Sequence, residues 1–396
     1  MSEAPLIREK VSQAIELLEE FDIDCWLTFV RETAVTPDPM LAFLCESDLT
    51  WHTVFLVTRQ GRAAAIVGQL DAQAVRDLGV YDPVIGYVKG IRRHLLDLLA
   101  ELQPRTIAAN YSQNSEVADG LSHGLYLTLI EYLGELGWQD RLISAEPVIS
   151  GVRARKSARE LERIRKAVAE TETIFDEVRR FIRPGQTERQ VARFIADRMR
   201  DRGLDPAWEP AQCPAVFTGP FTAEAHYAPT DRRIEPGHVL NMDFGVRVQG
   251  YCSDLQRTFY VRERGETGVP EEVARGFQTL VEAIECARRA IRPGVVGRDV
   301  DAAARGHLVR AGYEEYPHAL GHQVGRVAHD GTALLGPAWE KYGSRPELPL
   351  EAGMVFTLEP RLKVPGRGTV TVEEMVVVTP EGTQYLSTPQ REIWIV

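Results

Sequence analysis

The pattern of apolar and polar positions separates an early α/β region from a later region of long helices and strands. Apolar residues recur at helical spacing over residues 5–21, and short apolar runs over 25–29, 53–58 and 63–67 predict strands. The segment between the last two runs, Arg59-Gln60-Gly61-Arg62, predicts a hairpin. Because the alternation continues to about Val148 without a catalytic constellation, we expect a small α/β domain there.

Two sequence patterns in the later region indicate helix N-termini. Ser157 with Glu160, and Thr187 with Gln190, have the spacing of a capping box, in which two side chains satisfy free N–H groups of the first turn. Each start is followed by apolar residues at helical spacing. The sequence therefore predicts two consecutive helices after a break near Gly151.

An internal repeat organises this later region. Ile182-Arg183-Pro184-Gly185 recurs 109 residues further on as Ile291-Arg292-Pro293-Gly294, and the helix-ending Gly203 recurs at the same offset as Gly312. A repeated supersecondary unit explains the shared glycine better than chance does. We expect two similar halves, each with helices followed by strands, and a site where they meet would draw ligands from both.

Length and composition bound the answer further. A chain of 396 residues exceeds one ordinary core, so we predict two domains, residues 1–152 and 153–396. The net charge of −11 argues against nucleic acid or an anionic membrane as partner. No apolar run approaches a membrane span, and the N-terminus resembles no signal peptide. Five scattered cysteines without a C-x-x-C pair indicate reduced thiols and a cytoplasmic location.

Candidate chemistry lies in two predicted hairpins of the later region. Strands over 239–248 and 251–261, with their turn at 247–250, would place Asp243 opposite Asp254. Strands over 354–364 and 369–378 would likewise place Glu359 opposite Glu373. Opposed carboxylates repel unless they share a proton or bind a cation. A single such acid would more often be an exposed residue beside a Lys or Arg, but two pairs flanked by apolar residues favour a polyvalent cation.

Histidines add to this ligand set. His318, His322 and His329 lie within one span of 12 residues that begins in a glycine-rich segment, and His226 precedes the first hairpin. A lone histidine would more often be a core or surface residue, whereas this grouping favours ligand and acid/base roles. Four carboxylates and one imidazole suit Mn²⁺, Co²⁺ or Zn²⁺, with Mn²⁺ preferred here. Two ions bridged by carboxylate and water would neutralise the acids and activate that water as a nucleophile.

The motifs around these residues resemble the creatinase/prolidase/aminopeptidase P group of pita-bread metallopeptidases, and the resemblance covers nearly the whole chain. It is carried by Asp243-Phe244-Gly245, by Gly250-Tyr251-Cys252-Ser253-Asp254-Leu255-Gln256-Arg257-Thr258, by Gly321-His322-Gln323-Val324-Gly325, by Gly353-Met354-Val355-Phe356-Thr357-Leu358-Glu359-Pro360 and by Glu373-Glu374. It implies an α/β fold, with a creatinase-like α/β N-terminal domain followed by a pita-bread α+β catalytic domain with a pseudo-two-fold repeat.

The resemblance also implies a set of roles. The metal ligands would be Asp243, Asp254, His322, Glu359 and Glu373, holding two divalent ions per chain. Glu359 would double as proton shuttle, His226 would position substrate, and His329 would stabilise the oxyanion. His318 matches a further histidine near the site, and Phe217 would line an apolar wall for a proline ring. The protein is expected to form a homodimer.

Three positions depart from the family pattern. Gln323 follows the histidine ligand and Arg361 follows Glu359-Pro360, where the family commonly has glycine at each place. Thr371 stands two residues before the last ligand, where relatives carry an arginine that anchors substrate. Arg361 is a candidate replacement for that cation, although a solvated arginine at a strand end would look the same in sequence.

The function implied is hydrolysis of the Xaa-Pro bond at the N-terminus of dipeptides, as in a prolidase, or of longer peptides, as in an aminopeptidase. A creatinase-like amidinohydrolase would not need the full ligand set, and a catalytically silent binding scaffold would be expected to lose ligands. A methionine aminopeptidase would not need residues 1–150. The retained ligands therefore favour a metallopeptidase over these alternatives.

Overall fold

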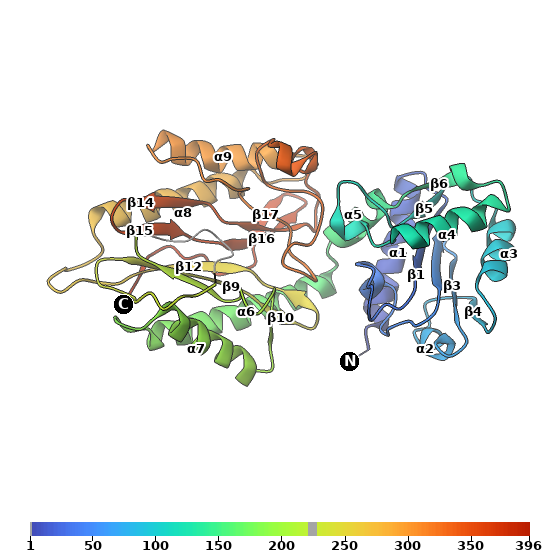
Figure 1. Cartoon of the computed structure of the whole chain (residues 1–396). Coiled ribbons are helices and arrows are strands. Elements are labelled where there is room, and N and C mark those ends of the chain that lie inside the picture. The colour runs from blue at the N-terminus through green and yellow to red at the C-terminus, as the bar shows by residue number, and fades with distance from the viewer. Residues whose placement is uncertain (1, 221–227) are drawn as a thin grey trace. The chain divides into compact units, whose positions relative to one another are not determined.

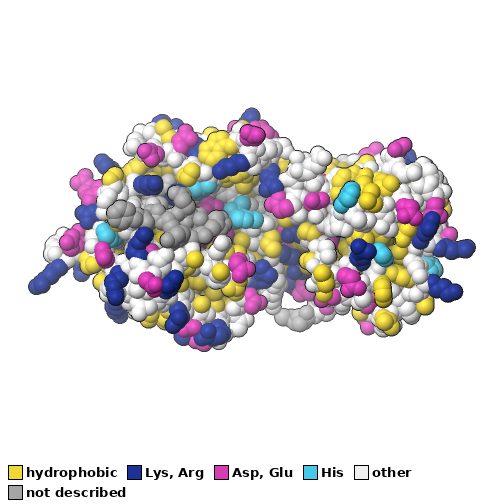
Figure 2. All heavy atoms as spheres, viewed as in Figure 1, with side chains coloured by type: hydrophobic (Ala, Val, Ile, Leu, Met, Phe, Trp, Pro, Cys, Tyr) yellow, Lys and Arg dark blue, Asp and Glu magenta, His cyan; other side chains and the backbone are white. Residues whose placement is uncertain are grey.

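The computed structural model describes residues 2–220 and 228–396, so the predicted substrate residue His226 lies outside the described residues. The chain forms two compact units, residues 1–153 and 154–396 (Figure 1). Within the described ranges, no helix combines the length and hydrophobicity that a membrane span requires. Acidic and basic side chains are interspersed on the face shown in Figure 2.

The N-terminal unit is built on a six-stranded mixed sheet in the order β4-β3-β2-β1-β5-β6. Its strands are β1 (Cys25–Val30), β2 (Thr53–Thr58), β3 (Ala63–Gly68), β4 (Val84–Tyr87), β5 (Ile107–Ala109) and β6 (Leu142–Ser144). Its helices are α1 (Ala4–Glu20), α2 (Ala72–Asp77), α3 (Arg92–Leu102), α4 (His123–Gly134) and α5 (Glu146–Ala154). β2 and β3 pair antiparallel, which confirms the predicted hairpin.

Both faces of this sheet are covered, and the strand sequences explain why. Every residue of β1, β2 and β3 is buried, as expected where apolar side chains on alternate sides both meet a core. Trp26 packs into one apolar cluster with Ile7 and Leu18 of α1. Its neighbour Leu27 points the other way, into a cluster with Leu95 and Leu129.

The helices of the C-terminal unit confirm the internal repeat. They are α6 (Ala158–Phe181), α7 (Glu188–Asp201), α8 (Glu271–Ala290) and α9 (Gly297–Arg310). Both predicted capping boxes are present, at the starts of α6 and α7. Gly185 and Gly294 have left-handed φ angles of 89° and 86°, so each half uses its glycine for the same turn between helices.

The strands of this unit lie between the helix pairs α6/α7 and α8/α9 (Figure 1). They are β7 (Asp205–Pro206), β8 (Ala215–Thr218), β9 (Val239–Phe244), β10 (Val246–Val248), β11 (Tyr251–Cys252), β12 (Leu255–Tyr260), β13 (Val355–Leu358), β14 (Arg361–Val364), β15 (Gly368–Thr371), β16 (Glu374–Thr379), β17 (Gly382–Tyr385) and β18 (Trp394–Ile395). The apolar faces of α8 and α9 pack with β13, β14 and β16 in one core.

The register of the first hairpin differs from the prediction. Asp243 is paired with Gln256 and not with Asp254. The reason is the turn, which is the two-residue pair Gln249-Gly250 with φ angles of 49° and 79°, and it shifts the pairing by two positions. An even shift keeps every side chain on its face of the sheet, so Asp243 and Asp254 still share one face.

The second hairpin has the predicted register. Leu358 pairs with Glu374 and Arg361 pairs with Thr371, so Glu359 and Glu373 lie at the same level between these pairs. Both strands are interrupted there. The Glu373 amide donates to the Gln256 carbonyl of β12 (3.2 Å), and this contact joins the second hairpin to the first.

Candidate metal centre

Acidic and imidazole side chains from both halves of the C-terminal unit converge on one place. Asp243 lies on β9 and Asp254 immediately precedes β12, whereas Glu359 follows β13 and Glu373 precedes β16. His322 comes from the segment between α9 and β13. The amide of His322 donates to the Thr357 hydroxyl (3.1 Å), which ties this segment to β13.

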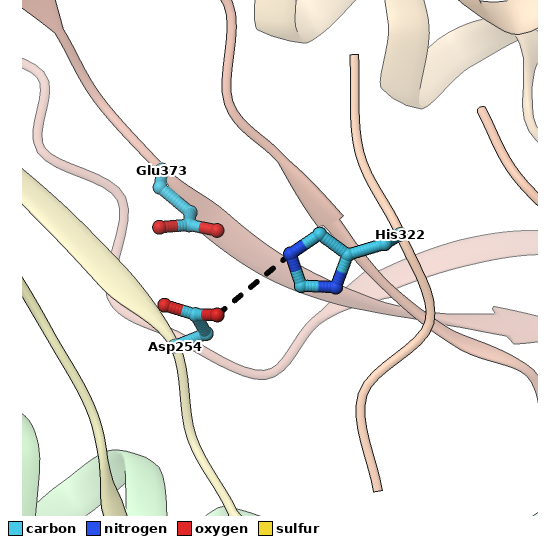
Figure 3. Close-up of side chains that lie close together, drawn as sticks. All are labelled: Asp254, His322 and Glu373. Carbon is cyan, nitrogen blue, oxygen red and sulfur yellow. Dashed lines mark ion pairs between the residues drawn. The ribbon is translucent and has the colours of Figure 1, made fainter. Parts of the chain in front are cut away.

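Figure 3 shows Asp254, His322 and Glu373 pointing toward one another. Each offers a ligand atom, and these atoms lie within 4.8 Å of one another. His322 Nε2 is 3.7 Å from Asp254 Oδ2 and 3.4 Å from Glu359 Oε1. The other ring nitrogen, Nδ1, lies 3.3 Å from the Gln323 carbonyl oxygen, which can only accept a hydrogen bond. A neutral His322 with its proton on Nδ1 therefore directs the Nε2 lone pair at the carboxylates.

The carboxylates of this cluster are in an unfavourable environment without a cation. Asp243 Oδ1 and Glu373 Oε2 are inaccessible to solvent and have no hydrogen-bond partner among the described residues. Burial raises the pKa of Asp243 to about 7. Burial, and then the Asp243 charge, raise the pKa of Glu359 to about 8. The pKa values of Asp254 and Glu373 are also raised, first by burial and then by the neighbouring negative charges.

These properties fit a bound divalent cation. Acceptor atoms withdrawn from water without a donor are costly, and a cation would satisfy them while offsetting the mutual repulsion. Oxygen ligands together with one imidazole form a set that Mn²⁺, Co²⁺ or Zn²⁺ accepts. The residues that could hold the metal are Asp243, Asp254, His322, Glu359 and Glu373, the set expected from the sequence.

The raised pKa values predict how the metal-free protein responds to pH. A carboxyl whose pKa is higher in the folded than in the unfolded chain stabilises the fold at low pH, and loses that contribution as pH rises through the folded value. For Asp243 and Glu359 the window runs from their ordinary values, 3.8 and 4.5, to about 7 and 8. In the presence of a chelator, we expect the thermal midpoint of unfolding to decrease as the pH is raised from 5 to 8.

Metal should act in the opposite direction in the same experiment. Because ligands must be deprotonated to bind, the rise in thermal midpoint on adding Mn²⁺ should grow from pH 5 to pH 8. A Mn²⁺-induced rise that is equal at both pH values would contradict the assignment of these carboxyls as ligands.

Two neighbours of the ligands were not recognised in the sequence. Thr357 Oγ1 lies 3.3 Å from Glu359 Oε1, and Gln256 Nε2 donates to Glu359 Oε2 at 3.4 Å. Each lies two residues from a candidate ligand along an extended segment. That spacing was the available signal, because side chains two apart on a strand share a face.

His329 lies beside the cluster. Its ring is 4.1 Å from that of His322, centroid to centroid, with the planes at 85°. The next residue, Asp330, is fully buried, accepts from the Arg326 amide (2.7 Å) and forms an ion pair with buried Lys156 (3.7 Å). The exposed imidazole of His329 thus stands on a firmly anchored turn.

His318 is held in a different way. Its Nδ1 lies 2.8 Å from the Ala319 carbonyl oxygen, and its ring packs against Tyr316 at 5.1 Å. Arg305 of α9 donates to the His318 carbonyl (2.8 Å) and is paired with Asp301 (2.7 Å). These contacts anchor the segment that leads to His322.

The two predicted substrate residues lie on strands next to the cluster. Phe217 pairs with Asn241 of β9, two positions from the pair formed by Ala215 and Asp243, so Phe217 shares the sheet face of Asp243. Arg361 lies directly opposite Thr371, the position at which the resemblance led us to expect an arginine. The Arg361 charge acts on the Glu359 carboxyl in the direction of a lower pKa.

Comparison with known proteins identifies the family that the chain resembles. The model of "Metallopeptidase family M24" matches residues 162–380, which is more than half of the chain. A protein of Mycobacterium tuberculosis named "Probable dipeptidase PepE" is 31% identical over 282 residues, 71% of this chain and 69% of that protein.

Solved structures extend the likeness to both units. Dipeptidase PepE from Mycobacterium ulcerans has a TM-score of 0.75 at 25% identity and covers 100% of this chain and 99% of its own. The X-Pro aminopeptidase from Thermotoga maritima has a TM-score of 0.72 at 25% identity, covering 98% and 99%. The expected fold, a creatinase-like α/β domain followed by a duplicated pita-bread domain, is thereby confirmed. The chain belongs to metallopeptidase family M24.

Proposed function

We propose that this metallopeptidase uses two divalent ions to hydrolyse the Xaa-Pro bond at the N-terminus of dipeptides, with longer Xaa-Pro peptides as the alternative substrates. The observation that carries the proposal is the shielded carboxylate cluster around His322, in which two acceptor oxygens have no donor among the described residues. The names of the relatives, a dipeptidase and an X-Pro aminopeptidase, support the substrate class. The homodimer and the cytoplasmic location stay predictions.

The proposed ligands are Asp243, Asp254, His322, Glu359 and Glu373, with Mn²⁺ preferred over Co²⁺ or Zn²⁺. Two bound ions would supply Lewis-acid activation of water and of the scissile carbonyl. Glu359 is proposed to carry a proton to the leaving proline nitrogen.

The histidines are proposed to serve the substrate. His329 is exposed beside His322 and can donate a hydrogen bond to the oxyanion that forms at the scissile carbonyl. His226 is proposed to position the substrate, and His318 to support the segment that carries His322. Phe217 is proposed to receive the proline ring.

Replacement of the two neighbouring histidines should separate their roles. His322→Ala should lower metal occupancy, because it removes a ligand. His329→Ala should retain the metal but lower kcat by a factor on the order of 10²–10³, because it removes an oxyanion donor. Elemental analysis and steady-state kinetics on both variants make the comparison. Equal loss of metal in both would refute the division into ligand and oxyanion donor.

Recognition of the substrate end separates a dipeptidase from an aminopeptidase. A Xaa-Pro dipeptide brings its free carboxylate into the site, and burying that charge without a cation is costly. Arg361 is the candidate cation. Side chains that are directly opposite on an antiparallel pair have Cβ atoms about 4.5–5.5 Å apart. A guanidinium from position 361 can therefore reach the space that one from position 371 would occupy.

The corresponding prediction concerns Arg361→Ala. Its KM for a Xaa-Pro dipeptide should rise strongly, whereas KM for a Xaa-Pro tripeptide should change little, because the tripeptide carboxylate lies one residue further out. Lys363→Ala is the matched control, since Lys363 lies two residues along the same strand on the same face. An equal effect on both substrates, or no effect, would mean that Arg361 has a structural role and that other residues recognise the substrate carboxylate.

The experiment that tests the proposal as a whole is hydrolysis of a Xaa-Pro dipeptide and a Xaa-Pro tripeptide side by side, with and without added Mn²⁺. Preference for the dipeptide supports the dipeptidase, and preference for the tripeptide supports the aminopeptidase. Hydrolysis of neither, by protein that has taken up metal, would overturn the proposed substrate class and reopen the amidinohydrolase and scaffold alternatives.

A further inference from the structure

Gln256 lies where the two hairpins of the candidate metal centre meet. It lies on β12 opposite Asp243 and two residues after Asp254. Its carbonyl accepts from the Glu373 amide, which joins the two hairpins. The side chain is buried, with 7% of the residue exposed. A neutral amide thus stands among carboxylates that otherwise only accept hydrogen bonds.

The hydrogen bonds of this side chain define the orientation of its amide group. Gln256 Nε2 donates to Glu359 Oε2 at 3.4 Å, and Gln256 Oε1 accepts from Thr371 Oγ1 at 2.5 Å. With a metal bound, Glu359 is deprotonated and has no proton to donate, so the amide nitrogen of Gln256 faces it. The Thr371 hydroxyl, which is buried, occupies the opposite end of the amide and stabilises this orientation.

The two oxygens of Glu359 consequently have different surroundings. Oε2 is held by Gln256, whereas Oε1 lies near Thr357 Oγ1 (3.3 Å) and His322 Nε2 (3.4 Å). The bond from Gln256 therefore keeps Oε1 turned toward His322. Without the bond from Gln256, only the contacts at Oε1 would restrain rotation of the Glu359 carboxylate about its terminal bond.

We propose that Gln256 is a positioning residue that orients the Glu359 carboxylate toward the metal centre, and that Thr371 acts on Glu359 through Gln256. The inference rests on the proposed metal-binding role of Glu359. It also gives a role to Thr371, the position at which the resemblance led us to expect an arginine. Here Thr371 supports the proposed metal ligand Glu359, and the proposed substrate-binding cation, Arg361, lies on the opposite strand.

The test measures Mn²⁺ affinity by competition with a chelator, well below the unfolding temperature of each variant. Gln256→Leu and Thr371→Val should each weaken Mn²⁺ binding about tenfold, the order of effect found when hydrogen-bond partners of metal ligands are removed. Thr371→Ser retains the hydroxyl and should bind Mn²⁺ as the wild type does. The double variant should be no weaker than Gln256→Leu alone, because both residues act through one bond.

Thr279→Val is the matched control for loss of a buried threonine hydroxyl. Thr279 lies on α8, and its hydroxyl donates within that helix to the Arg275 carbonyl (2.8 Å). It should leave Mn²⁺ affinity unchanged. Wild-type affinity in both Gln256→Leu and Thr371→Val, or additive losses in the double variant, would overturn the inference and leave the proposed function standing. A wild-type protein that takes up no Mn²⁺ or other divalent metal would overturn the proposed function itself, and this inference with it.

Discussion

Exhaustive chelation should reduce hydrolysis of Xaa-Pro peptides by this protein to the background rate. The reason is that its own side chains offer the reaction carboxylates, imidazoles and a guanidinium, but no group that polarises a peptide carbonyl as strongly as a divalent ion does. Adding Mn²⁺ back should restore activity, with saturation at about two ions per chain, the number that would offset four acids. Elemental analysis and activity measured on the same samples provide the check.

A second metal ion series sharpens the result. Co²⁺ and Zn²⁺ should restore activity to different extents, whereas Ca²⁺, which takes six to eight oxygen ligands and disfavours imidazole, should restore none. Full activity in protein that contains no metal by elemental analysis would contradict the central assignment.

Replacement of Asp254 should produce the second large effect. Asp254→Asn retains the size of the side chain but removes a charge that lies beside His322 and Glu373. Turnover should fall by more than about 100-fold, because even the outer hydrogen-bond partners of metal ligands are worth 10–100-fold. The thermal midpoint of the metal-free protein should be unchanged or higher, since burial and the charges of Asp243 and Glu359 already oppose ionisation at this position.

A matched buried acid should behave in the opposite way. Asp301 is also buried, but it is paired with Arg305 at 2.7 Å, so Asp301→Asn removes the closest ion-pair partner of a buried guanidinium and should cost about 3 kcal/mol of stability. If Asp254→Asn destabilised the metal-free protein as Asp301→Asn is expected to, Asp254 would be a structural residue. Retained turnover above about a tenth of wild type would also argue against its role as a ligand.

The sequence by itself determined much of this protein, where the deciding contacts are local. Ser157 and Thr187 cap their helices as their spacing predicts, and Gly185 and Gly294 make the same left-handed turn in each half. These features depend on atoms a few residues apart, so short patterns specify them. The alternation of side chains likewise indicated which acids share a face, and an error of two in the first hairpin left that inference intact.

Only the tertiary structure decided which side chains meet. The turn at Gln249-Gly250 makes Gln256 the partner of Asp243, and packing of the two hairpins then brings the Gln256 amide to Glu359, more than 100 residues away. His322 reaches Asp254 from a segment without regular structure, held by Thr357. Arg361 stands across from Thr371 because of the second register. Contacts of this kind depend on how separate elements pack, which no pattern within one element records.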